Sequence, residues 1–241
     1  MPHPLVSVIL PVYNGARFLR DAVESARGQR YEPLEIVIVD DGSTDDTKEV
    51  AASLGGEISY VHQQNAGPPA ARNTGLRMAR GPLIGFLDAD DLWTQGKLAL
   101  QVARLMDEPS VDVVLGYTQV VYVGTQHEAH RGRPLPPPGP ALVLGAALFR
   151  RSSFERVGVL DETLRYSDDV DWFLRAKERG VSLRIHEDIV LLYRRHDRNL
   201  TSQKDLDRSL VSMLKKSLDW RRRAGGGTVQ PFARWGEPQE R

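Results

Sequence analysis

The first ninety residues alternate between apolar runs and helix-spaced apolar positions. Residues 5–12 alternate and then run apolar, and residues 34–39 form a continuous apolar stretch, which predicts two buried strands. Between them, apolar side chains recur at the spacing of a helix, at Phe18, Leu19, Ala22, Val23 and Ala26. After the second strand, Ser43 is expected to cap a helix in which Asp46 takes the N3 position of a capping box.

The same pattern repeats once more before residue 90. A short strand is expected near residues 58–62, a helix over residues 68–79 and a buried strand over residues 82–87. Strand, helix, strand, helix, strand is the order of a parallel α/β sheet. Ligands bind such sheets at the loops that follow the carboxyl ends of the strands.

Beyond residue 94 the pattern continues and then breaks. Residues 95–106 have helical spacing, and residues 111–123 predict a further strand. Residues 124–140 are rich in proline, which removes backbone donors and fixes φ, so no regular structure is expected there. This segment is either a mobile lid over a site or a plain connector.

The remaining part of the chain contains further apolar and helical stretches. Residues 141–149 are apolar again, residues 167–179 predict a helix that begins with acidic side chains, and residues 189–192 predict a short strand. A last amphipathic helix is expected from an apolar stripe formed by Leu206, Leu210, Leu214 and Leu218. The final stretch, from residue 224 to the end, lacks periodicity and is expected to fray.

Composition narrows the class of protein. The chain has 241 residues and a formal net charge of +0. Its net charge therefore creates no positive electrostatic potential that would indicate nucleic acid as a partner. It has 0 cysteines, which excludes disulfides and thiolate metal sites. No apolar stretch approaches the roughly 18–20 residues needed to span a bilayer, and polar residues come too early for a signal peptide. We therefore expect a globular, cytoplasmic protein.

The acidic cluster after the strand over residues 82–87 is the most informative chemical feature. Asp88, Asp90 and Asp91 follow an apolar run directly. Clustered carboxylates repel one another unless a cation or proton compensates, and a hard divalent ion shared with substrate phosphates would do so. Taken alone, the cluster is better described as a turn followed by a helix cap, since Asp favours both.

Three other polar clusters lie at predicted strand ends or in loops, over residues 11–14, 40–45 and 63–73. Together with the acidic cluster they indicate a nucleotide site. Asp41 can accept a hydrogen bond from a base N–H, and Gly42 supplies a tight turn. Arg72 is expected near the start of its helix, where it either reaches a phosphate or base edge or forms a surface salt bridge. Residues 65–73 contain no glycine-rich phosphate fingerprint, and residues 40–45 lack the alternating Asp spacing of an EF-hand calcium loop.

These motifs together resemble a known family. Pro-Val-Tyr-Asn at 11–14, Val-Asp-Asp-Gly-Ser-Thr-Asp at 39–45, Gln-Asn-Ala-Gly at 64–67, Ala-Arg-Asn at 71–73 and Phe-Leu-Asp-Ala-Asp-Asp at 86–91 occur in this order. The chain resembles the family 2 glycosyltransferases of the GT-A fold over roughly residues 5–200. The resemblance implies a Rossmann-like, mixed but mostly parallel sheet flanked by helices, with the amphipathic C-terminal helix added.

The resemblance also implies an activity and its participants. The implied activity is transfer of a sugar, with inversion, from a nucleotide-diphosphate sugar to an acceptor hydroxyl. A UDP-sugar is the favoured donor, and the implied cofactor is Mn²⁺ or Mg²⁺. The acceptor would be a carbohydrate, a lipid-linked molecule or another hydroxyl compound of polysaccharide or glycoconjugate biosynthesis. By resemblance, the donor contacts are Pro11, Tyr13, Asn14, Asp41, Arg72, Asp88, Ala89 and Asp90. Asp88 would face the ribose, Asp90 would bind the metal, and Asp91 is the alternative ligand.

A catalytic base is expected downstream, where the family has an acidic pair at the start of a helix. This chain has Asp168 and Asp169 in place of the usual Glu-Asp, and Asp169 matches the base. The helix N-terminus lowers the pKa of both carboxyls, whereas each raises the pKa of the other. Alternatively, the pair only complements the helix dipole. Asp168 and Trp172 are the expected acceptor contacts, the latter by stacking on a sugar.

His196 follows the strand predicted over residues 189–192. In similar enzymes a His near this point approaches the metal or the diphosphate, so we expect His196 to join Asp90 there. A solvated His on a basic loop is the alternative.

The expected organisation is a glycosyltransferase domain over residues 1–203 and a C-terminal helix and tail over residues 204–241. Within the domain, residues 1–115 would bind the nucleotide sugar, and residues 116–203 would face the acceptor. The basic C-terminal helix either packs on its own domain, forms a homodimer or rests on the inner face of the membrane. Two other classes remain open: a nucleotide-sugar-binding module without transfer activity, and a nucleotidyltransferase.

Overall fold

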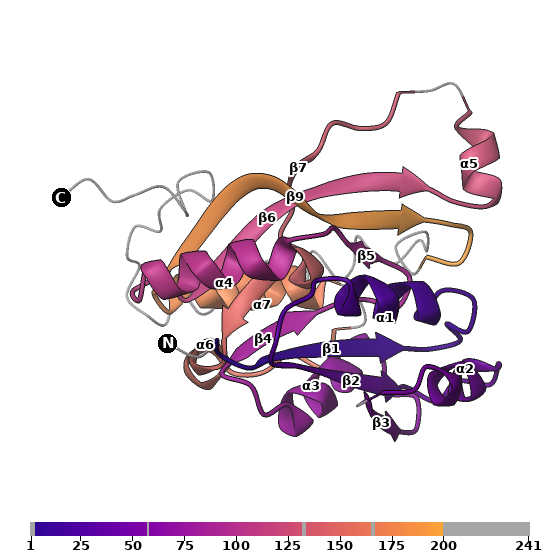
Figure 1. The fold of residues 1–241 in the computed structure, drawn as a ribbon, viewed down its shortest axis with the longest axis horizontal. Helices are drawn as coiled ribbons and strands as arrows, with labels where there is room; N and C mark the ends of the chain where they lie inside the picture. The colour runs from indigo at the N-terminus through magenta and orange to yellow at the C-terminus, as the bar shows by residue number, and fades with distance from the viewer. Residues whose placement is uncertain (1–2, 57, 132–133, 165–166, 200–241) are drawn as a thin grey trace.

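The computed structural model describes residues 3–56, 58–131, 134–164 and 167–199. This part of the chain forms a nine-stranded sheet in the order β3-β2-β1-β4-β8-β6-β9-β5, with β7 paired to β6 outside this path (Figure 1). The strands are β1 (Val6–Val12), β2 (Leu34–Asp40), β3 (Ile58–His62), β4 (Leu83–Phe86), β5 (Leu92–Trp93), β6 (Val113–Tyr122), β7 (Gly139–Pro140), β8 (Ala147–Arg150) and β9 (Leu183–Arg195).

The helices lie between these strands in the chain. They are α1 (Leu19–Arg27), α2 (Thr47–Ser53), α3 (Pro68–Met78), α4 (Lys97–Asp107), α5 (Thr125–Ala129), α6 (Arg151–Val157) and α7 (Asp168–Glu178), with a short 3₁₀ turn at Leu144–Ala146. The predicted α/β class with a mixed sheet is confirmed, and the predicted elements of the first hundred residues occur within a few residues of their expected bounds.

Four neighbouring strands, β3, β2, β1 and β4, are all parallel. Their register aligns Val12 with Asp40 and Asp40 with His62, so the carboxyl ends of three strands meet at one edge of the sheet. The polar clusters that follow these strands are therefore brought together, as parallel pairing requires.

The other half of the sheet is mixed. β8 is antiparallel to both β4 and β6, β6 and β9 run parallel, and β5 pairs antiparallel with β9. The long strands β6 and β9 lie side by side and lead toward α5 (Figure 1). β6 crosses the boundary expected near residue 115, so the two predicted halves share one continuous sheet.

Helices cover both faces of the sheet. α1 and α4 lie on one face, and α3, α6 and α7 lie on the other (Figure 1). α3 approaches β1 closely because Gly75 faces Ile9; a Cβ at Gly75 would lie 2.2 Å from the Cγ2 of Ile9. This contact holds α3 against the parallel half of the sheet.

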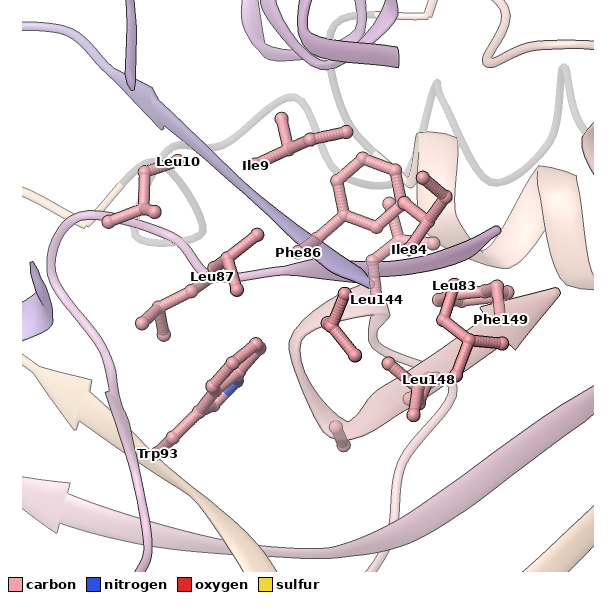
Figure 2. Packing of buried hydrophobic residues seen from close by; sticks show 14 of the residues in the cluster. Ile9, Leu10, Leu83, Ile84, Phe86, Leu87, Trp93, Leu144, Leu148 and Phe149 are labelled. Atoms are coloured by element: carbon pink, nitrogen blue, oxygen red, sulfur yellow. The ribbon is translucent and has the colours of Figure 1, made fainter. Parts of the chain in front are cut away.

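The core is continuous across the parallel and mixed halves. Figure 2 shows Ile9 and Phe86 of neighbouring strands packed together with Phe149 of β8. On the same face Trp172 of α7 is fully buried, with its ring 5.2 Å from the ring of Phe149 and 4.8 Å from that of Phe154. Buried aromatic side chains of this size dominate packing energetics, so α7 is anchored firmly to the sheet.

A polar group is also buried on the opposite face. The side chain of Lys97 is 1% exposed, and its Nζ donates to the Oε1 of Gln101 at 2.6 Å and to the carbonyl of Ala147 at 3.3 Å. The ammonium also lies 4.9 Å from the centre of the Trp93 ring. Burial lowers the pKa of Lys97 well below its ordinary value.

Two local expectations are wrong. Helix α2 begins at Thr47 with Asp46 at the N-cap, rather than at a capping box on Ser43. Ser43 is held in a turn instead, because its N–H donates to the Oδ1 of Asp40 at 2.8 Å. In the segment 124–140, expected to lack regular structure, helix α5 forms before the prolines begin and β7 pairs with β6.

Strand β9 is much longer than the predicted residues 189–192, because its amino-terminal part pairs with β6. The expected C-terminal helix and its membrane or dimer contacts lie outside the described residues. Within the described residues, no helix has both the length and the apolar character needed to cross a bilayer.

Candidate active site

The loops after β1 and β2 are joined to each other by side chains. The Oγ of Ser43 accepts from the N–H of Asn14 at 2.8 Å, and the Oδ1 of Asn14 accepts from the N–H of Thr44 at 2.8 Å. Asn14 is therefore placed between the two loops and orders them. Gly42 has φ +81°, which agrees with the tight turn expected there.

Asp41 orders the loop before α3. Its Oδ1 accepts from the side chain of Gln63 at 2.7 Å and from the N–H of Ala66 at 3.0 Å, and its Oδ2 accepts from the N–H of Gly67 at 2.8 Å. The side chain is buried. These bonds engage both oxygens, so Asp41 shapes the wall of the expected nucleoside pocket.

Tyr13 is exposed to solvent at the carboxyl edge of the sheet. Its side chain is 54% exposed at the end of β1, whereas Pro11 and Ala89 are buried nearby in the chain's strand-end segments. An exposed aromatic ring at the carboxyl edge of a parallel sheet is suited to stacking on a base.

Arg72 connects two acidic clusters. Its Nη2 donates to the Oδ1 of Asp88 at 2.6 Å, and its Nη1 donates to the Oδ2 of Asp168 at 2.7 Å. One alternative expected for Arg72 is a surface salt bridge. Arg72 does form salt bridges, but the one with Asp168 is buried, because the Arg72 and Asp168 side chains are 10% and 7% exposed. One guanidinium therefore joins the end of β4 to the start of α7.

Asp169 lies beside this bridge, and among the residues that the structure describes no cation forms a salt bridge with it. Its Oδ1 accepts from the N–H of Val170 at 2.7 Å. Removal of the carboxyl from water and the charge of Asp168 raise the pKa of Asp169 to about 7, although Arg72 acts in the opposite sense. The helix N-terminus was expected to keep this carboxyl strongly acidic, and for Asp169 desolvation outweighs that effect. A carboxyl with this pKa is suited to accept a proton near neutral pH.

Asp90 meets His196 at the other end of the site. The Oδ2 of Asp90 lies 3.0 Å from the Nε2 of His196 and accepts from the Nδ2 of Asn199 at 3.2 Å. The ring of Phe18 packs against the His196 ring at 4.6 Å between centres. The predicted approach of His196 to Asp90 is seen in this geometry.

Asn199 has no role among the expectations from sequence, since an Asn three residues after a His matches no spacing typical of a site. Its Oδ1 accepts from the N–H of His196, and its Nδ2 also donates to the carbonyl of Arg194 at 3.1 Å. Asn199 thus fixes the loop that carries His196.

Asp91 points away from this pair. Its side chain is 3% exposed, and its Oδ1 accepts from the N–H of Arg194 in β9 at 2.9 Å. Burial, and then the charge of Asp90, raises the pKa of Asp91 well above its ordinary value. The alternative role of Asp91 as a metal ligand does not fit this placement, because the carboxyl joins β9 to the end of β4.

The structure places Trp172 in the core and not at the expected acceptor site. The side chain is 0% exposed and its Nε1 donates to the carbonyl of Gly158 at 3.0 Å. Neither face of the ring is open to an acceptor sugar, so the expected stacking role is wrong. A Trp at the buried spacing of an amphipathic helix is a core residue first.

Asp90 provides a carboxylate oxygen of the kind that binds Mn²⁺ or Mg²⁺, and His196 places an imidazole nitrogen, a common metal ligand, beside it. Asp90 is partly open, with 33% of its side chain exposed, so a diphosphate can reach the same point. Among the described residues, no three His, Cys, Asp or Glu side chains gather into a complete metal site. The donor set therefore fits a cation that takes its remaining ligands from substrate and water.

The fold and this arrangement of carboxylates agree with the sequence relationships of the chain. Residues 7–158 match the family described as Glycosyl transferase family 2, and the chain belongs to that family.

Curated relatives of the chain are named as glycosyltransferases. An uncharacterized glycosyltransferase of Rickettsia prowazekii is 35% identical over 184 residues, which are 70% of this chain and 58% of the relative. The uncharacterized glycosyltransferase EpsJ of Bacillus subtilis is 31% identical over 218 residues, which are 82% of this chain and 63% of EpsJ. The chain thus spans less than two thirds of the length of either relative.

Solved structures share the fold. TarS of S. aureus, in complex with UDP-GlcNAc, superposes with a TM-score of 0.69 at 20% identity, over 88% of this chain and 66% of that one. The mannosyltransferase PcManGT from Pyrobaculum calidifontis, in complex with GDP-Man and Mn²⁺, gives a TM-score of 0.70 at 23% identity, over 96% of this chain and 67% of that one.

Proposed function

We propose that the chain transfers a sugar, with inversion, from a nucleotide-diphosphate sugar to an acceptor hydroxyl, with Asp169 as the general base. The observation that carries this proposal is the placement of Asp169. It is a carboxyl with a pKa of about 7 next to the Arg72 bridge, which leads directly to Asp88 at the donor edge of the sheet. Family membership supports the same reaction class.

The donor is proposed to lie along the carboxyl ends of β1, β2 and β4. Tyr13 would stack on the base, and the loop held by Asp41 and Asn14 would enclose the nucleoside. Asp88 is 41% exposed and would accept a hydrogen bond from the ribose. UDP-GlcNAc and GDP-Man bound to two proteins of the same fold make both nucleotides reasonable probes.

Asp90 and His196 would hold a divalent cation beside the diphosphate. Bound there, Mn²⁺ or Mg²⁺ would neutralise the charge that develops on the departing nucleotide. Asn199 would keep the two side chains together, because it contacts both of them.

The chemical step needs one proton acceptor on the chain. Asp169 would take the proton of the acceptor hydroxyl while that oxygen forms a bond to C1 of the sugar. The bond from C1 to the diphosphate oxygen breaks on the opposite face, and its electron pair leaves with the nucleotide. Positioning and electrostatics supply most of the rate in such a displacement.

The test is a screen of UDP- and GDP-sugars with Mn²⁺, in which thermal shift reports binding and nucleotide release reports turnover. We expect one class of donor to raise the melting temperature only with the cation and to be turned over, with a saccharide acceptor increasing the rate. Binding without release under every condition would instead identify a nucleotide-sugar-binding module. Release of pyrophosphate from a nucleoside triphosphate and a sugar phosphate would indicate a nucleotidyltransferase.

A further inference from the structure

Two adjacent residues of α3 reach from the donor half of the molecule to the segment that carries the proposed base. Arg72 is 8% exposed and Asn73 is 0% exposed. Both side chains find their partners about ninety positions further along the chain, at Asp168 and Leu160 respectively. Buried polar groups at such a separation fix how two parts of a fold lie against each other.

Asn73 uses its whole amide on this segment. Its Nδ2 donates to the carbonyl of Leu160 at 2.9 Å and to the Oε1 of Glu162 at 2.8 Å, and its Oδ1 accepts from the N–H of Leu160 at 3.0 Å. A backbone N–H and C=O bound by one side chain act as a short piece of β-pairing. No side chain without both a donor and an acceptor at these positions can replace it.

Arg72 holds the far end of the same segment. Its planar guanidinium donates to Asp168, the first residue of α7, and to Asp88 after β4. A Lys in this place would keep the charge but could not present two parallel N–H groups to two carboxylates in fixed directions. The segment from Leu160 to Asp168 is therefore held at both ends by consecutive residues of one helix.

Helix α3 is itself fixed on the donor half. Gly75 lies directly against Ile9 of β1, and the N–H of Gly67 at the start of α3 donates to Asp41 of the donor wall. Any displacement of α3 relative to β1 would thus be transmitted to α7 through Arg72 and Asn73.

We infer that Arg72 and Asn73 form a clamp that positions Asp169 relative to the donor, so that both are positioning residues for transfer. The inference rests on the proposed function, because it takes Asp169 as the base. Asp169 follows Asp168 directly in the chain, and the clamp acts on it through that neighbour.

The test compares Asn73→Asp and Arg72→Lys with unaltered protein and with Arg77→Lys, an exposed position on the same helix that serves as the matched control. Asn73→Asp keeps an acceptor for Leu160 but sets a carboxylate against Glu162. Should Asn73→Asp fail to fold, Glu162→Gln provides a milder variant, at an exposed residue that loses only charge.

Three measurements are made on the full chain. Hydrogen exchange reports the mobility of residues 160–171 and of β1. Calorimetry with UDP or GDP and Mn²⁺ reports donor-side binding. Release of nucleotide from UDP-N-acetylglucosamine or GDP-mannose, with Mn²⁺, reports turnover.

In the Asn73 and Arg72 variants we expect faster exchange over residues 160–171 with β1 unchanged. In the Asn73 variant nucleotide affinity should stay within about threefold, because Asn73 contacts none of the proposed donor residues. Turnover number should fall by about 10- to 100-fold, since a misplacement of about 1 Å costs this much. Glu162→Gln should show the same direction with a smaller loss, and Arg77→Lys should match the unaltered protein.

Turnover equal to that of the unaltered protein in both clamp variants would overturn the inference, as would loss of nucleotide binding in proportion to turnover. The second result would mean that the pair merely supports the fold. Failure of the proposed function looks different: the unaltered protein would then release no nucleotide, whatever the exchange of residues 160–171.

Discussion

Two acidic clusters lie on either side of Arg72, and within each cluster the aspartates differ in their contacts. In the cluster after β4, Asp91 is buried against the backbone of β9 while Asp90 stays partly open beside His196 and Asn199. In the cluster that opens α7, Asp168 is tied to Arg72, while Asp169 accepts from the N–H of Val170 and has no salt bridge within the described part of the chain. Each cluster thus contains one carboxylate that supports structure and one that is available for chemistry.

The difference lies in what surrounds the available carboxylate. Asp90 has the His196 ring and the Asn199 amide at hydrogen-bond distance and an open side, which suits a cation that brings its own ligands. Asp169 is half-buried beside another carboxylate, and desolvation together with that charge raises its pKa to about 7. Under the proposed function, identical side chains would take the roles of ligand and base because their burial and partners differ.

The strongest test of this comparison is Asp169→Asn. We expect nucleotide release to fall by about 10²-fold or more, because the amide cannot take the acceptor proton. Nucleotide affinity, measured by calorimetry, should be retained. Asp107→Asn, at the exposed end of α4, is the control for the loss of one carboxylate, and comparable turnover in the two variants would remove Asp169 from the mechanism.

Asp90→Ala should have the next largest effect and of a different kind. Donor affinity in the presence of Mn²⁺ should fall by about 10- to 100-fold, whereas affinity without the cation should change little. Calorimetry with and without Mn²⁺ separates the two. If the cation dependence survives intact, the cation is held elsewhere.

The pH profile sharpens the difference between the clusters. A base must be deprotonated to act, so turnover should be low below the pKa of Asp169 and rise with pH through about 7. Asp168→Asn removes the neighbouring charge that raises this pKa, so the acidic limb should move to lower pH, even where the plateau is reduced. A limb that stays in place would mean that another group sets it.

The smallest effect is expected for Asp91→Asn. The amide oxygen still accepts from the N–H of Arg194, and the buried negative charge is removed, so the free energy of unfolding should change by about 1 kcal/mol or less. Cation-dependent donor affinity should stay within about threefold. A loss as large as that of Asp90→Ala would return Asp91 to the metal site.

The parallel half of the fold could be predicted from sequence because its signals are local. Apolar runs give β1, β2 and β4, and parallel pairing then brings the residues at their carboxyl ends together. The placement of Asp90 near His196 required the resemblance to a family as well. The positions of strand ends and the spacing of motifs do not show which side chain each residue will contact.

The remaining features depend on contacts between distant parts of the chain. The two carboxylates on Arg72, the Leu160 contact of Asn73 and the loop contacts of Asn199 follow from the packing of α3 and β9. The burial of Trp172 depends on the position of β8 under α7. Desolvation of Asp169 likewise arises only after folding, so the sequence argument, which set the helix dipole against the neighbouring carboxylate, could not decide the direction of its pKa shift.

The buried Lys97 has a thermodynamic consequence for the whole fold. The unfolded chain holds a proton on this amine up to an ordinary lysine pKa, whereas the folded chain releases it at lower pH because burial lowers the pKa. Between these two values the unfolded state binds more protons, so proton uptake on unfolding makes the free energy of unfolding rise with pH. The folded state therefore gains stability on the alkaline side through the buried amine of Lys97.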